Sequence, residues 1–369
     1  MVGSKLQIGI VGLPNVGKST LFNALTKQSV PAENYPFCTI DPSVGVVGVP
    51  DERLPALAAI SKSENVLPAA IEFVDIAGLV KGASEGAGLG NQFLAHIREV
   101  DAILEVVRFF DDTDMHHVHG EVDPVRDIEV INLELILADT EQVKKRRGKL
   151  ERDIKARVAD AIVEDAVLIK IEQALHAGTL AHGVALTDNE REQVATLNLL
   201  TMKPILYALN RKSGGHNLDE LADGRAEHAY DAIGRLGSRF VKVDAATERE
   251  LNDVAEGDAA AFRQEFGVQE NGLAELIRGA YETLGLITFF TTGEKETHAW
   301  TVPKGSTAPE AGAAIHSDFR DKFIRAEVVR AEDLIRMGSY AAVREAACLR
   351  TEGKDYIVKD GDVIVFLHG

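Results

Sequence analysis

Cysteine is scarce in this chain, and long apolar runs are missing from it. The 369 residues include two cysteines, Cys38 and Cys348. So few cysteines exclude a scaffold built on disulfides and favour a reducing compartment, so a cytoplasmic location is expected. No apolar run approaches the roughly 18 residues that span a bilayer, and the glycine-interrupted N-terminus is not typical of a signal peptide. Membrane association is therefore not expected.

Basic residues are also fewer than acidic ones. The chain has 40 Lys and Arg residues against 58 Asp and Glu residues, a formal net charge of −18. A general nucleic-acid coat needs clustered Lys and Arg, so this class is excluded and DNA is not an expected partner. Residues 141–157 are an exception, with 8 basic against 3 acidic residues. The run 144–149 within them either contacts RNA phosphates or is a solvated helix face.

The pattern that is present is that of an α/β protein. Towards the N-terminus, short apolar runs alternate with stretches of helical character. The apolar runs cover 6–11, 71–74 and 102–107, and the helical stretches cover 19–26 and 90–99. This alternation predicts a parallel sheet with helices on both faces.

A change of pattern near Asp127 predicts an insertion into this α/β domain. Apolar residues recur there at helical spacing, and Thr187 to Glu190 have the capping-box pattern that starts a returning helix. We expect a helical, coiled-coil-like hairpin over 131–202. The strand-like run 204–209 then resumes the α/β pattern, so the first domain is expected to comprise 1–130 and 203–282.

The end of the chain, 283–369, predicts a separate small domain of mixed β/α type. Strand-like runs alternate here with one helical stretch. The expected strands are 287–291 and 298–302, which should form a hairpin, with 323–329 and 361–366, and the expected helix is 309–316.

The strongest functional signal is a phosphate-binding motif. Residues 12–19 are Gly-Leu-Pro-Asn-Val-Gly-Lys-Ser, which fits G-x-x-x-x-G-K-[ST], and they lie between an expected strand and an expected helix. Glycines let backbone N–H groups point at phosphate oxygens, and the helix N-terminus adds partial positive charge. Lys18 is expected to reach the β- and γ-phosphates, and the Ser19 hydroxyl to bind Mg²⁺. The strand–loop–helix context argues against a chance glycine-rich turn.

Two further positions complete the expected metal and γ-phosphate contacts. Asp75 ends an apolar strand and begins Asp-Ile-Ala-Gly, so its carboxylate is expected to hold Mg²⁺ through a water. The amide of Gly78 would then contact the γ-phosphate. Thr39 lies between the two motifs, where a switch loop supplies a Thr to Mg²⁺; an ordinary loop Thr is the alternative.

The residue that would activate water is less clear. Leu79 follows Gly78, at the position where related GTPases place a water-orienting Gln. Leu cannot orient water, so either hydrolysis is slow or another residue acts. The run 115–120, Met-His-His-Val-His-Gly, offers imidazoles. It is a catalytic loop, a metal-binding tract or a solvated loop, and the residues alone do not decide.

The base-recognition motif is also altered. Guanine-specific proteins use Asn-x-x-Asp, whose carboxylate accepts two hydrogen bonds from the guanine edge. This chain has Asn-Arg-Lys-Ser at 210–213. Ser213 cannot accept that pair, so guanine specificity loses its physical basis. Asn210 either bonds a purine edge, braces the phosphate loop or simply starts a turn.

These residues resemble the Obg-like ATPases of the YchF type. The resemblance covers essentially the whole chain, and its long motif runs are specific. They are 12–20, 34–42, 74–84, 88–90 and 354–362.

The resemblance implies a G-type P-loop domain, an inserted helical arm over 131–202 and a C-terminal TGS domain of β-grasp form. It implies slow, Mg²⁺-dependent hydrolysis of ATP in preference to GTP, and association with the ribosome, with large-subunit RNA as the expected contact. It implies that His117 and Lys18 are the catalytic residues. The implied nucleotide contacts are Asn15, Val16, Gly17, Lys18, Ser19, Thr20 and Gly78, with Asn210 and Arg211 flanking the adenine. The implied Mg²⁺ ligands are Ser19 and Thr39, beside Asp75.

The resemblance also points to a potassium site and shows one departure from the family pattern. Asn15 matches the asparagine that coordinates K⁺ in potassium-activated relatives, where the cation supplies positive charge beside the phosphates. The family has Asn-x-x-Glu where this chain ends its motif in Ser213.

Three functions follow. The first is a ribosome-associated ATPase that acts as a slow switch. The second is an Obg-type GTPase or an enzyme that uses both nucleotides. The third is a non-enzymatic ribosome or RNA adaptor whose nucleotide is a structural ligand.

Overall fold

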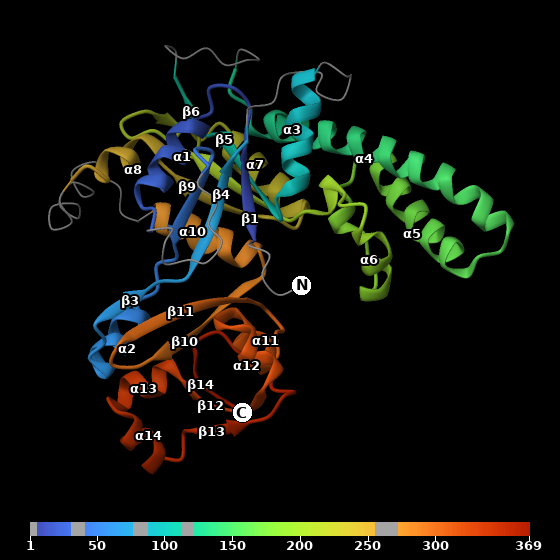
Figure 1. Ribbon diagram of the computed structural model, residues 1–369. Coiled ribbons are helices and arrows are strands. Elements are labelled where there is room, and N and C mark those ends of the chain that lie inside the picture. The colour runs from blue at the N-terminus through green and yellow to red at the C-terminus, as the bar shows by residue number, and fades with distance from the viewer. Residues whose placement is uncertain (1–5, 31–40, 77–87, 113–120, 255–271) are drawn as a thin grey trace. The chain divides into compact units, whose positions relative to one another are not determined.

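The computed structural model describes residues 6–30, 41–76, 88–112, 121–254 and 272–369 (Figure 1). The chain divides into two compact units. We call the first the P-loop unit; it comprises 7–27 and 73–276. The second, the C-terminal unit, comprises 1–6, 28–72 and 277–369. No helix in the described ranges is long and apolar enough to cross a membrane.

The P-loop unit is built on a parallel sheet, part of a six-stranded sheet with the order β2-β4-β1-β5-β7-β9. β1 pairs with β5, β5 with β7 and β7 with β9, all in parallel. Every residue of β5 and β7 is buried, as is typical of parallel strands covered on both faces. The predicted parallel α/β fold is thus confirmed. The strands are β1 Gln7–Val11, β2 Val44–Gly48, β4 Ala70–Asp75, β5 Ala102–Arg108, β7 Ile205–Asn210 and β9 Arg239–Val243.

Helices follow these strands along the chain. They are α1 Lys18–Lys27, α3 Gly88–Glu99, α7 Arg225–Arg235, α8 Ala245–Leu251 and α10 Gly272–Thr283. A separate two-stranded sheet pairs β6, Phe110–Asp111, with β8, His216–Asn217, in antiparallel fashion.

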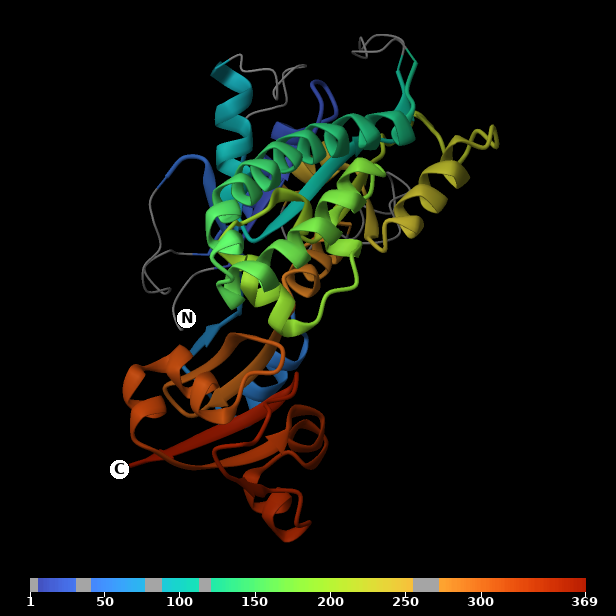
Figure 2. The ribbon, with the colours of Figure 1, turned by 90° about the vertical axis from the view of Figure 1, so that its right-hand side faces the viewer.

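The inserted arm consists of two long helices that lie side by side, as Figures 1 and 2 show. α4 covers Pro124–Lys155 and α5 covers Ala159–His176. α4 begins before residue 131 because Asp123 caps it, accepting bonds from the next two available amides, and proline occupies the first helical turn. Arg146 of α4 donates two bonds of 2.6 and 2.7 Å to Glu164 of α5. The predicted helical hairpin is therefore present.

The return from the arm is short. It contains the 3₁₀ turn Ala181–Gly183, α6 Asp188–Ala195 and the 3₁₀ turn Leu200–Met202. The capping box predicted at Thr187 is present, because its side chain accepts from the Glu190 amide and Glu190 accepts from the Thr187 amide. Asp139 of α4 accepts bonds from the amides of Leu200 and Thr201, which fastens the return to the arm.

The C-terminal unit is a mixed sheet with the order β13-β12-β14-β10-β11-β3. The predicted hairpin is β10 Leu286–Thr292 with β11 Glu296–Pro303. The remaining strands are β3 Asn65–Leu67, β12 Phe323–Arg330, β13 Arg350–Glu352 and β14 Asp362–His368, and the helices are α2 Arg53–Ser61, α11 Ala308–Ile315, α12 Ser317–Asp321, α13 Ala331–Met337 and α14 Tyr340–Glu345.

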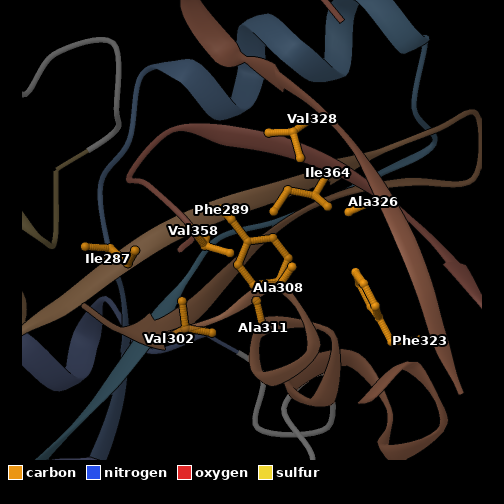
Figure 3. Close-up of a cluster of buried hydrophobic side chains, with 10 residues drawn as sticks. All are labelled: Ile287, Phe289, Val302, Ala308, Ala311, Phe323, Ala326, Val328, Val358 and Ile364. Atoms are coloured by element: carbon orange, nitrogen blue, oxygen red, sulfur yellow. The ribbon is translucent and has the colours of Figure 1, made fainter. Parts of the chain in front are cut away.

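The core of this unit lies between the sheet and α11. Figure 3 shows Phe289 of β10 facing the small residues Ala308 and Ala311 of α11. Side chains from β12 and β14, among them Val328 and Ile364, complete the cluster. Small helix residues let α11 approach the sheet closely, which fits a small domain with one core.

One segment of this unit comes from far away in the sequence. α2 and β3 precede β4 in the chain, within the range 1–130 that the sequence pattern assigns to the first domain. In the structure, β3 pairs in parallel with β11, Asn65 opposite Glu296. Arg53 of α2 bonds Asp360 at 2.8 Å and stacks over the Phe290 ring. These contacts place 53–67 in the C-terminal unit, which neither periodicity nor motif indicated.

Candidate nucleotide-binding site

The phosphate loop, residues 12–17, connects β1 to α1 in a conformation that requires its glycines. Asn15 and Gly17 have φ angles of 65° and 95°, in the left-handed region. A Cβ atom on Gly12 would lie 2.8 Å from the Val106 carbonyl oxygen, and one on Gly17 would overlap Nδ2 of Asn210. The chain therefore curls tightly just before the N-terminus of α1, which is the arrangement that binds phosphate through backbone amides.

Two predicted phosphate and metal residues meet at this loop. Lys18, at the start of α1, forms an ion pair with Asp75, the last residue of β4. Their side chains are 12% and 26% exposed, so both are largely shielded from solvent. The structure thus brings together two motifs that are 57 residues apart.

The oxygen ligands beside Lys18 fit a magnesium ion. Ser19 is exposed at the start of α1, and Asp75 offers a carboxylate. Hydroxyl and carboxylate oxygens are the protein ligands Mg²⁺ prefers, alongside water and substrate phosphate. Within the described ranges, no group of three or more His, Cys, Asp or Glu side chains is arranged to hold a metal ion by itself. Phosphate oxygens would therefore have to complete such a site.

Asn210 connects the phosphate loop to the start of α8. It is the last residue of β7 and is 5% exposed. Its Nδ2 donates to the Val16 carbonyl at 2.8 Å, and its Oδ1 accepts from the Ala245 amide at 3.1 Å. Of the three interpretations open from the sequence, the structure supports the one in which Asn210 braces the phosphate loop.

The three residues after Asn210 point in different directions. Arg211 pairs with Glu220, and Lys212 pairs with Asp112. The Ser213 amide donates to Oδ2 of Asp244 at 2.5 Å. Asp244 follows β9 directly and was not singled out from the sequence. An aspartate between a strand and a helix is a common N-cap, which is the signal that would have found it.

The histidine-containing stretch is bounded by a network of ion pairs. Arg225 of α7 bonds both carboxylate oxygens of Asp111, at 3.1 and 2.6 Å, and the Val122 carbonyl at 2.9 Å. It therefore joins the chain on either side of 113–120. Hydrogen bonds to Asp111 and Asp223 raise the pKa of the Arg225 guanidinium. No sequence pattern selects Arg225, because its partners at 111 and 122 are distant along the chain.

Buried Arg108 binds the chain just before the same stretch. Its Nε donates to the Phe110 carbonyl and its Nη2 to the Asp112 carbonyl, both at 3.1 Å. Burial lowers the pKa of this guanidinium. His117 itself, like Thr39, Gly78 and Leu79, lies outside the described residues.

Two family models match different parts of this chain. Residues 7–138 match the family model MMR_HSR1, described as a 50S ribosome-binding GTPase. Residues 286–368 match the model YchF-GTPase_C, described as a protein of unknown function (DUF933). The Ribosome-binding ATPase YchF of Bacillus subtilis is 48% identical over 365 residues, which cover 98% of each chain.

This chain belongs to the YchF family. A second YchF relative, the Ribosome-binding ATPase YchF of Escherichia coli O157:H7, is 47% identical over 359 residues, 97% of this chain and 98% of that protein. The solved structure of the Schizosaccharomyces pombe YchF GTPase matches with a TM-score of 0.86 and 37% identity, covering 100% of this chain and 99% of that one. The resemblance seen in the sequence, and the fold it implied, are therefore confirmed.

Proposed function

We propose that this chain is a Mg²⁺-dependent ATPase that binds the ribosome as a nucleotide-dependent switch in the cytoplasm. The observation that carries the proposal is the meeting of Lys18 and Asp75 at a glycine-curled loop that opens α1. Relatives along the full chain carry the name ribosome-binding ATPase, which supports ATP as the nucleotide.

In this proposal each group at the loop contacts a particular part of the triphosphate. Backbone amides of Asn15 to Thr20 bind the phosphate oxygens, and Lys18 leaves Asp75 to contact the β- and γ-phosphates. Mg²⁺ would be held by Ser19 and Thr39, with Asp75 contributing through a water, and would neutralise phosphate charge. The Gly78 amide contacts the γ-phosphate, and Arg211 flanks the base.

Water activation is assigned to His117. Leu79 has no polar atom to orient water, so a group from elsewhere must do so. Arg225 binds described residues on both sides of the stretch that carries the histidine, and Arg108 binds Asp112 just before it. A K⁺ ion bound by Asn15 would add positive charge where other enzymes use an arginine finger.

The variant His117→Ala tests the enzymatic assignment. We expect kcat to fall at least about 100-fold, because a positioned general base or water-orienting group contributes that much. The affinity for ATP should change less than about twofold, since the imidazole contacts water and not the nucleotide. His119→Ala, in the same stretch, is the matched control and should keep its turnover. Unchanged hydrolysis by His117→Ala would remove the histidine from the mechanism. No turnover above background by the wild type, even with ribosomes, would favour the adaptor function.

The arm is the proposed ribosome contact, and its basic run, 144–149, contains two kinds of residue. Arg146 and Arg147 are committed to carboxylates of α5, the latter to Asp165 at 2.8 Å. Lys144, Lys145 and Lys149 are exposed. These three lysines are the ones available to phosphates of large-subunit RNA.

Replacing the three exposed lysines by alanine tests this surface. Co-sedimentation with ribosomes should weaken, and the slope of log affinity against log salt should shrink by about 2 to 3, since each phosphate contact contributes about 0.7 to 0.9. The control removes the same charge from the C-terminal unit, at exposed Lys295, Lys304 and Lys354. A loss seen only with the control triple would move the RNA contact to that unit.

A further inference from the structure

The base end of the site has a carboxylate that the sequence motif lacks. Ser213 occupies the fourth position of the Asn-x-x-Ser motif and has no carboxylate of its own. Its amide nevertheless donates to Asp244 Oδ2 at 2.5 Å. An acidic side chain from another part of the chain therefore lies against the residue where base-reading motifs carry their acid.

Local structure fixes the orientation of Asp244. It is the N-cap of α8, and its Oδ1 accepts from the Thr247 amide at 3.0 Å. Its Oδ2 also accepts from the Thr247 hydroxyl at 2.8 Å, and Thr247 is buried. The next residue, Ala245, donates its amide to Asn210, the residue that braces the phosphate loop. Asn210 thus links the start of α8, which carries Asp244 as its cap, to the phosphate loop.

Counting acceptor positions shows what this carboxylate can still bind. A carboxylate offers about four lone-pair positions. Within the described part of the chain, two on Oδ2 are taken by the Ser213 amide and the Thr247 hydroxyl, and one on Oδ1 by the Thr247 amide. One acceptor position on Oδ1 is left. Asp244 is only partly buried, as contact between this position and a ligand would require.

We propose that Asp244 is the specificity-determining residue of the base site and accepts one hydrogen bond from the 6-amino group of adenine. The inference rests on the proposed function, in which ATP is the nucleotide. Adenine presents a single amino group at this edge, which matches a single open acceptor. Guanine presents two adjacent donors, which need both oxygens of one carboxylate, and its 6-oxo group would face the negative charge. Failure to pair buried polar groups is what makes such a site selective.

The competing role for Asp244 is purely structural, as the cap of α8, and the test must separate the two. Asp244→Ser is suited to this because serine is also a good N-cap but has no carboxylate. Ser213→Ala is the matched control: it removes the 3.2 Å bond between the Thr247 and Ser213 hydroxyls, whereas the bond to Asp244 comes from the backbone amide and survives the substitution. Thermal unfolding of both variants checks that the fold is kept.

The readout is the ratio of dissociation constants for ATP and purine riboside 5′-triphosphate, which lacks the 6-amino group, measured by calorimetry. We expect the wild type and Ser213→Ala to bind ATP about 10-fold or more tightly than the analogue, as a hydrogen bond to a charged group allows. In Asp244→Ser the ratio should fall to about one through a loss in ATP affinity alone. GTP affinity should stay the same or rise.

The outcomes that oppose the inference are distinct from failure of the proposed function. Equal binding of ATP and the analogue by the wild type would overturn the inference while leaving a nucleotide site intact. So would a ratio that Asp244→Ser leaves unchanged, since a helix cap alone predicts that result. Absence of binding by either triphosphate would overturn the proposed function and this inference with it.

Discussion

At the phosphate end of the site one contiguous stretch, 12–19, supplies the loop, the lysine and the helix N-terminus. At the base end, by contrast, the residues that hold the proposed base-reading carboxylate come from separate places: Asn210 and Ser213 after β7, and Asp244 and Thr247 after β9. The phosphate end works mainly through backbone amides, which any sequence with the right glycines can present. The base end works through side chains, whose roles can move from one strand end to another.

This difference predicts that the two ends tolerate substitution unequally. A phosphate group is recognised mainly by backbone amides at a helix N-terminus, and these belong to the loop itself. A base edge is recognised by one or two oriented acceptors, and a carboxylate from an adjacent loop can serve as well as one inside the motif. Ser213 beside Asp244 is such a case.

The largest expected effect is at the phosphate end, from Lys18→Ala. Removing the lysine that we propose contacts the transferring phosphate should lower kcat/KM by at least about 100-fold, as loss of a transition-state charge contact does elsewhere. Phosphate release under multiple turnover measures it. Lys27→Ala is the matched control: it ends the same helix and has a surface partner, Asp253, so turnover should stay within about twofold. Comparable losses in both variants would show that α1, not the Lys18 charge, is what matters.

The same contrast decides what could be predicted from the sequence. The phosphate loop, the helical hairpin and the β10–β11 hairpin were predictable because each depends on contiguous residues, such as the capping box at Thr187. The pairing of β3 with β11 was not, because a three-residue strand has no periodicity of its own. Neither were Arg225 and Asp244, whose partners are fixed by the packing of α7 and by the meeting of β7 with β9.

An intermediate effect is expected where the two ends touch, from Gly17→Ala. The new Cβ would combine a φ of 95° with an overlap with Asn210 Nδ2, at a cost of about 3 kcal/mol. Gly178→Ala, with a φ of 75° and nothing within 4 Å, should cost about 1 kcal/mol. Scanning calorimetry with and without ATP distinguishes them. Gly17→Ala should lower the Tm and lose the ATP-induced rise, whereas Gly178→Ala should keep that rise. If Gly17→Ala keeps it too, the ends are not coupled through Asn210.

The smallest expected effect is the sharpest test of the base end: exchanging its two residues in the double variant Ser213→Asp with Asp244→Ser. The carboxylate then stands within the motif as Asn-x-x-Asp, and the serine introduced by the second substitution still caps α8. The carboxylate introduced by Ser213→Asp would no longer have an oxygen occupied by the amide of a loop neighbour, so both oxygens could face the two donors of guanine. The ratio of GTP to ATP affinity should therefore rise about tenfold over the wild type, whereas Asp244→Ser alone should mainly weaken the binding of ATP.

Because the two residues are in contact, their effects on binding free energy should not add, and the departure from additivity measures their coupling. If the change in the free-energy difference between GTP and ATP binding equalled the sum of the changes in the two single variants, the two positions would read the base independently. At the phosphate end no such exchange exists, because there the recognising groups are the backbone itself.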